Sequence, residues 1–130
     1  MSGDCLLALD VGNTNTVLGL HDGERWIEHW RVETHAKTTT DEVGVLYLNL
    51  FQARGIAPER VRSAIVSCVV PPAVHANRRA CQRYFGVEAK LFWGKEVTQA
   101  VTDFRLAKMR GELDGLLATP SGGNGGQNPG

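Results

Sequence analysis

Residues 5–16 read Cys5-Leu6-Leu7-Ala8-Leu9-Asp10-Val11-Gly12-Asn13-Thr14-Asn15-Thr16. The first half is a short, continuous apolar run, which is typical of a strand buried on both faces. The second half combines a glycine with small polar residues, which are the commonest turn formers. This stretch therefore predicts a buried strand, a tight turn and the start of a second strand.

The turn after this strand is the part of the sequence that indicates chemistry. Small polar residues in a turn can direct several backbone N–H groups and hydroxyls at one point, as a phosphate chain requires. The carboxylate of Asp10 can hold a divalent cation or its water shell. An ordinary hairpin turn is the alternative, because the same residue types close such turns. A carboxylate directly after an apolar run costs free energy, which favours the phosphate-binding interpretation.

Three strands joined by tight turns are predicted at the start of the chain. Apolar and small residues resume at 16–20, residues 21–24 supply a second turn, and residues 26–32 alternate between two faces. This alternation places Trp26 and Trp30 on the same face of the sheet. The three segments indicate an antiparallel meander.

Two helices and two further strands are expected after the meander. Apolar residues recur at helical spacing between Thr39 and Gly55, and Thr39 with Glu42 has the spacing of a capping box. The remaining elements are a buried strand, a second helix and a last strand, at 64–70, 73–85 and 87–93.

The expected order is β-β-β-α-β-α-β, which belongs to the α/β class. Helical crossovers make the later strands parallel to the first, so a mixed sheet with helices packed on it is predicted. Residues 1–95 form the domain. The apolar spacing decays after Val101, so residues 96–118 are expected to be an irregular or weakly helical extension. Residues 119–130 are rich in glycine and are expected to be disordered.

Composition narrows the function classes. The 14 basic residues balance 14 acidic ones, which argues against a protein that wraps nucleic acid or lies on an anionic membrane. No apolar run is long enough to span a bilayer and no signal pattern opens the chain, so a soluble, cytoplasmic protein is expected. The 3 cysteines lack metal-site spacing and are interpreted as buried free thiols.

The opening stretch resembles the first phosphate motif of type III pantothenate kinases, a branch of the superfamily that also holds sugar kinases, actin and heat-shock chaperones. Four further segments occur in the order and at about the spacing of that family: Trp30-Arg31-Val32-Glu33-Thr34, Thr40-Asp41-Glu42, Ser67-Cys68-Val69-Val70-Pro71-Pro72 and Tyr84-Phe85-Gly86-Val87. The resemblance extends from residue 5 to about residue 93.

The resemblance implies an RNase H-like (actin-like ATPase) fold, of which the family carries two copies with ATP in the cleft between them. It implies transfer of the γ-phosphoryl group of ATP to pantothenate, giving 4′-phosphopantothenate, the first step of coenzyme A biosynthesis. Asp10 would position Mg²⁺ through water, together with the transferring group. A monovalent cation (K⁺ or NH₄⁺) and a homodimer are also implied. The phosphate-binding residues would be Asp10, Val11, Gly12, Asn13, Thr14, Asn15, Thr16 and Val17.

The sequence departs from the family after the last expected strand. Members carry a Gly-Ala-Asp-Arg segment whose aspartate is the general base, followed by a second domain, and neither is found in this chain. Asp103 with Arg105 has the wrong spacing and is interpreted as a solvated surface pair. The site of the monovalent cation is expected to be absent as well. We therefore expect a truncated kinase half that is inactive alone.

Other interpretations stay open from the sequence. A non-catalytic regulatory protein, similar to the Bvg accessory factor group and acting through a protein partner, belongs to a different class; a chain without a function of its own is a third possibility. Arg31 is either an exposed strand cation or a residue that shapes the cleft. The histidines lack metal-ligand spacing. Arg78, Arg79 and Arg83 are interpreted as a solvated helix face.

Overall fold

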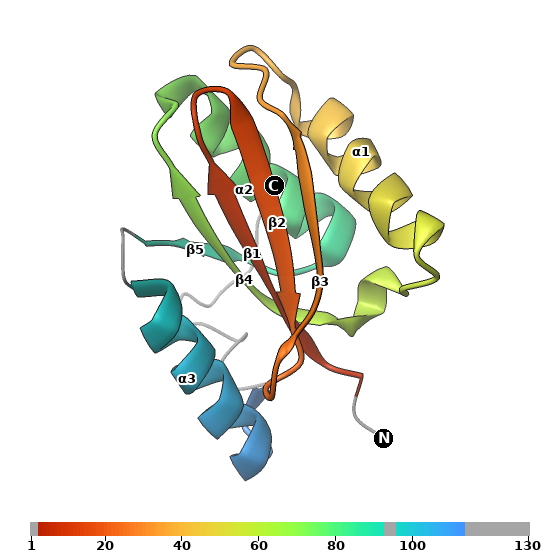
Figure 1. Cartoon of the computed structure of the whole chain (residues 1–130), viewed down its shortest axis with the longest axis vertical. Helices are drawn as coiled ribbons and strands as arrows, with labels where there is room; N and C mark the ends of the chain where they lie inside the picture. The colour runs from red at the N-terminus through yellow and green to blue at the C-terminus, as the bar shows by residue number, and fades with distance from the viewer. Residues whose placement is uncertain (1–2, 93–95, 114–130) are drawn as a thin grey trace.

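The computed structural model describes residues 3–92 and 96–113, which form one sheet with helices on both faces (Figure 1). The strands are β1 Cys5–Val11, β2 Asn15–His21, β3 Trp26–Glu33, β4 Val61–Cys68 and β5 Ala89–Leu91. The helices are α1 Thr40–Ala53, the 3-10 turn η1 Pro58–Arg60, α2 Pro71–Phe85 and α3 Glu96–Arg110. The β-β-β-α-β-α-β order predicted from the sequence is confirmed, and α3 follows it.

The sheet is mixed, as predicted, with the strand order β3-β2-β1-β4-β5. The central strand β1 pairs antiparallel with β2 and parallel with β4. The β2–β3 pair is antiparallel and the β4–β5 pair is parallel. The first strand therefore lies in the middle of the sheet, which explains why its sequence is apolar on both faces.

The main core lies between the sheet and the helices α1 and α2. Leu7 and Leu9 of β1 point to this face, as do their cross-strand partners Leu20 and Leu18 of β2. All four side chains are fully buried. The ring of Phe51 from α1 packs into the same cluster.

The sequence signals for the helix ends are confirmed. Thr39 and Glu42 form a reciprocal capping box at the start of α1, with both backbone N–H bonds at 3.1 Å. Gly86 ends α2 in the left-handed conformation, with φ of 72°. These local interactions fix where the two covering helices begin and end.

The opposite face of the sheet is partly covered by α3. Phe104 is 1% exposed and packs in a second cluster with Leu6 and Ile65. The guanidinium of Arg105 donates to the carbonyl of Gly23 at 2.6 Å, and the ammonium of Lys108 donates to the carbonyl of Asp4 at 3.0 Å. Helix α3 therefore belongs to the folded domain.

Residues 96–110 are a regular helix, where the sequence predicts an irregular or weakly helical extension. The apolar pattern underestimates α3 because few of its side chains are buried and polar bonds to distant backbone atoms hold it. Residues 114–118 of that extension, and the glycine-rich stretch 119–130, lie outside the described residues.

The prediction that Trp26 and Trp30 share a face is wrong. A register shift in the β2–β3 pairing between Leu20 and His21 changes the alternation. Trp30 stacks on Phe51 on the α1 side, with ring centroids 5.3 Å apart. Trp26 instead lies edge-on to His21, with centroids 4.8 Å apart, on the other face.

Two smaller expectations can be compared with the structure. The 3 cysteines are buried and free, as predicted. Within residues 3–92 and 96–113, none of the helices has the length and apolar character needed to cross a membrane.

Candidate functional site

The turn between β1 and β2 lies at the carboxyl end of the parallel strands. The N–H of Val69, just after β4, donates to the carbonyl of Val11 at 3.1 Å, so the ends of β1 and β4 lie side by side. Helix α2 begins at this end of the sheet, and Figure 1 shows the turn beside it. Ligands of open α/β sheets bind at this end of the strands.

The turn is closed by a single backbone bond, from the N–H of Gly12 to the carbonyl of Asn15 at 2.9 Å. Its central residues, Asn13 and Thr14, are exposed. Across the described part of the chain, the N–H groups of Asn13 and Thr14 donate to no protein acceptor. These groups are available to an anion, as the phosphate-binding interpretation requires.

The carboxylate of Asp10 is exposed and lies on the face of the sheet opposite α1 and α2. Helix α3 covers the Leu6 half of this face and leaves the Asp10 half open. In the strand registers, Asp10 is flanked by Ser67 of β4 and Val17 of β2, and Arg31 of β3 is the next residue in this row. Two strand spacings place Arg31 about 10 Å from Asp10. Arg31 is exposed at this edge, and its role stays open.

The other predicted site residues divide between the two faces. Val17 lies beside Asp10, whereas the side chains of Val11 and Thr16 are buried on the α1–α2 side. The hydroxyl of Thr16 lies 2.7 Å from the hydroxyl of Thr34. The side chains of Val11 and Thr16 therefore do not face a ligand on the open side of the sheet. Gly12, Asn13, Thr14 and Asn15 form the turn itself.

Thr34 is the contact residue that the sequence does not reveal. Its N–H donates to the carbonyl of Thr14 at 2.9 Å, and its hydroxyl pairs with Thr16. The length of the predicted hairpin between the second and third strands is the signal that could have identified Thr34. It places the residue that follows the third strand beside the first turn.

A small cavity of about 30 Å³ lies beneath the turn and is lined by Thr16, Thr34, Tyr47 and Asn77, among others. The phenol of Tyr47 donates to Asn77 Oδ1 at 2.6 Å, and Asn77 Nδ2 donates to the carbonyl of Ala73 at 2.9 Å. Burial raises the pKa of the Tyr47 phenol, so this group stays a proton donor. The polar pair links α1 to α2 below the turn.

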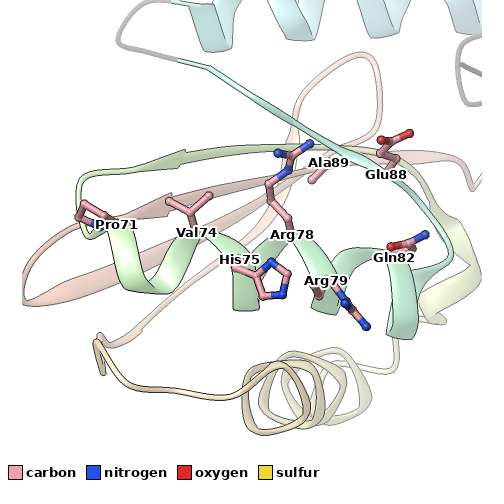
Figure 2. A pocket seen from close by; sticks show the side chains of 8 residues that line it. All are labelled: Pro71, Val74, His75, Arg78, Arg79, Gln82, Glu88 and Ala89. Carbon is pink, nitrogen blue, oxygen red and sulfur yellow. The ribbon is translucent and has the colours of Figure 1, made fainter. Parts of the chain in front are cut away.

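A larger hollow of about 330 Å³ lies between α2 and β5. Figure 2 shows that the guanidinium groups of Arg78 and Arg79 point away from each other there. Arg79 and Glu88 already have interactions within the protein. Arg83, the third arginine of the predicted solvated face, lies 3.7 Å from Asp41 of α1. The lining includes no residue of the β1–β2 turn, so this hollow is separate from the candidate site.

A magnesium site at the turn would have one protein carboxylate, that of Asp10. Residues 3–92 and 96–113 contain no group of three His, Cys, Asp or Glu side chains that could hold a metal by themselves. Mg²⁺ is commonly bound through one or two carboxylates together with the phosphates of a substrate. The exposed Asp10 beside free N–H groups fits this kind of site.

A family model and the curated relatives of this chain agree on one family. A family model for type III pantothenate kinases matches residues 6–107. The type III pantothenate kinase of Myxococcus xanthus is 52% identical over 82 residues, which are 63% of this chain and 32% of that protein. That of Syntrophobacter fumaroxidans is 47% identical over 83 residues, 64% of this chain and 32% of the relative. The chain thus spans about a third of the length of these curated relatives.

Two solved structures share the fold. The ROK hexokinase of Thermus thermophilus has a TM-score of 0.50 at 18% identity, covering 68% of this chain and 34% of that chain. The RuvC protein of T. thermophilus, solved in complex with a Holliday junction substrate, has a TM-score of 0.52 at 20% identity. This match covers 85% of this chain and 79% of the RuvC chain. At these identities the likeness concerns the fold alone, and the predicted RNase H-like, actin-like ATPase class is confirmed.

Proposed function

Because the chain belongs to the type III pantothenate kinase family, we propose that its β1–β2 turn binds the phosphates of ATP for phosphorylation of pantothenate to 4′-phosphopantothenate. The observation that carries this proposal is the arrangement at the turn. The N–H groups of Asn13 and Thr14 are free, and the carboxylate of Asp10 is exposed at the adjacent strand end.

The proposed roles follow from what phosphoryl transfer requires. Transfer of the γ-phosphoryl group to a primary hydroxyl depends on positioning and charge neutralisation more than on covalent chemistry. The N–H groups of Asn13 and Thr14 donate to phosphate oxygens, and Asp10 holds the hydrated cation that accompanies the nucleotide. Mg²⁺, when bound, supplies the neutralising charge.

We also propose that residues 1–130 on their own bind nucleotide but do not phosphorylate pantothenate. The Gly-Ala-Asp-Arg segment expected of the family is not part of this sequence. Asp103 does not take its place, because it accepts a hydrogen bond from Gln99 at 2.8 Å on the exposed side of α3. The guanidinium of Arg105 donates to the carbonyl of Gly23, so Asp103 and Arg105 do not form the surface pair predicted from the sequence. The phosphate half of the reaction is therefore what this chain offers.

The family resemblance implies a homodimer and a K⁺ or NH₄⁺ requirement for the full-length kinases, and we propose that the cation site is absent from residues 1–130. The relatives named above are kinases, and no described feature favours the non-catalytic regulatory alternative.

Thermal unfolding with ATP and Mg²⁺ tests the binding step, because a ligand that binds only the folded state raises the melting temperature. The unaltered chain should be stabilised by millimolar ATP·Mg²⁺, and Asp10→Asn should abolish the shift. Asp103→Asn is the matched control and should keep it. An equal shift in all three proteins would contradict the assignment of Asp10. ADP release with pantothenate, measured in parallel, should stay at background. Turnover that Asp10→Asn removes would refute the proposal that residues 1–130 bind nucleotide without phosphorylating pantothenate.

A further inference from the structure

We propose that Thr34 is a positioning residue that holds the β1–β2 turn in its anion-binding conformation; this inference rests on the proposed function. Thr34 lies immediately after β3 and contacts the turn from outside. It makes two bonds, from its N–H to the carbonyl of Thr14 at 2.9 Å and between its hydroxyl and that of Thr16 at 2.7 Å. One residue thus holds both the turn, at Thr14, and the start of β2, at Thr16.

The turn needs such a contact because its own geometry is weakly favoured. Hairpin loops with two central residues prefer conformations with positive φ, which match the twist of the strands. Among the described residues, the only positive φ values belong to Gly23, Gly55, Gly86 and Gly111, so no residue of this turn has one. A single backbone bond, from Gly12 to Asn15, closes the turn. The two bonds from Thr34 supply the restraint that the backbone conformation does not.

The restraint acts on backbone that adjoins the groups proposed to face the ligand. A peptide unit is planar, so its carbonyl and the following N–H point in opposite directions. Because the Thr14 carbonyl is directed to Thr34, the N–H of Asn15 is directed away from β3. Thr16 is 4% exposed, and its hydroxyl is held on the core side by Thr34. Thr34 therefore fixes the peptide unit between Thr14 and Asn15, which adjoins the Asn13 and Thr14 N–H groups that the proposed function assigns to phosphate.

The central variant is Thr34→Val, which removes the hydroxyl and keeps the shape of the side chain. Thr34→Ser restores a hydroxyl. Thr38→Val is the matched control, because Thr38 lines the same small cavity and has no hydrogen bond to the turn. Thr16→Val combined with Thr34→Val removes both hydroxyls, so no buried polar group loses its partner and folding stability is separated from positioning.

Two measurements decide the proposal. Amide hydrogen exchange of Gly12 and Thr34, whose N–H groups are bonded to Asn15 and Thr14, is measured without nucleotide, and the Kd for ATP·Mg²⁺ is measured by calorimetry well below the melting temperature. Loss of one hydrogen bond predicts about a fivefold increase in turn exchange and about a fivefold weaker Kd for Thr34→Val. Thr34→Ser and Thr38→Val should behave like the unaltered chain, and the double variant should recover stability but keep the faster exchange.

Unchanged turn exchange in Thr34→Val would overturn the positioning role, as would an effect equal to that of Thr38→Val. If the unaltered chain does not bind ATP, the proposed function fails, and the exchange measurement still decides whether Thr34 orders the turn.

Discussion

Asp10 and Thr16 flank the same turn, yet their side chains lie on opposite faces of the sheet. Asp10 pairs with Val17 and is exposed on the open face, whereas Thr16 pairs with Val11 and is 4% exposed on the side of α1 and α2. The carboxylate is thus placed for a ligand and the hydroxyl for the core. Under the proposed function, this separation gives the chemistry to Asp10 and the backbone of the turn, and a supporting role to Thr16 with Thr34.

The close packing of α2 against α1 at Gly44 leads us to expect that Gly44→Ala destabilises the fold. A Cβ at Gly44 would lie 2.1 Å from Cδ2 of the Tyr84 ring, close to the ring's attachment and not at a flexible end. Overpacking of this kind typically costs about 1–3 kcal/mol in the free energy of unfolding, measured by urea denaturation. Val45→Ala, at a side chain that is 48% exposed, should change it by less than about 0.5 kcal/mol. Equal effects of the two variants would show that α1 and α2 do not pack closely at Gly44 and Tyr84.

Because α3 packs on the sheet through Phe104, we expect Phe104→Ala to lower the free energy of unfolding strongly. This ring is 1% exposed in the cluster that joins α3 to β1 and β4. Removing a buried aromatic side chain typically lowers the free energy of unfolding by about 3–5 kcal/mol. Met109→Ala, at a side chain that is 72% exposed on the same helix, serves as the control. A small effect of Phe104→Ala in urea denaturation would mean that α3 is not part of the cooperative domain.

His21 predicts a loss of stability on acidification. Burial lowers the pKa of His21 below its ordinary value of 6.5, with a smaller opposing effect of the Asp22 carboxylate. Its Nδ1 also accepts the N–H of Gly23 at 3.0 Å, which requires that this nitrogen is unprotonated. The unfolded chain therefore binds the proton more readily than the folded one. The contribution of neutral His21 to the free energy of unfolding is fully present above pH 6.5. It is lost as the pH falls through the lower pKa that His21 has in the folded chain.

His21→Asn tests this directly, because an amide oxygen can accept the same bond without taking up a proton. Urea denaturation between about pH 8 and pH 5 should show a shallower decline in the free energy of unfolding for His21→Asn than for the unaltered chain. Parallel declines would assign the acid sensitivity to other groups.

Most of the fold could be predicted because its signals are local. The capping box of Thr39 and Glu42, the stop at Gly86 and the apolar run of β1 each act within a few residues. The face of Trp26 could not be predicted, since a shift in strand register has no counterpart in simple alternation. The regularity of α3 could not be predicted, because it depends on Gly23 and Leu6, which are far away in the sequence.

The candidate site was predictable in part for the same reason. Asp10 and the turn are contiguous, so the sequence predicts a phosphate-binding loop there, with an ordinary hairpin turn as the alternative. The burial of Thr16 depends on which face of β2 meets the helices, and the role of Thr34 depends on the β2–β3 register. Both are properties of strand pairing that a linear motif does not contain.

The amide chemical shifts of the protein, titrated with ATP·Mg²⁺, test the central claim most directly, because they locate the bound phosphates. We predict that the largest changes occur at Gly12, Asn13, Thr14 and Asn15, that Asp10→Asn removes them, and that Arg78→Gln in the α2–β5 hollow leaves them unchanged. Changes concentrated around Arg78 and Arg79, and insensitive to Asp10→Asn, would contradict the account.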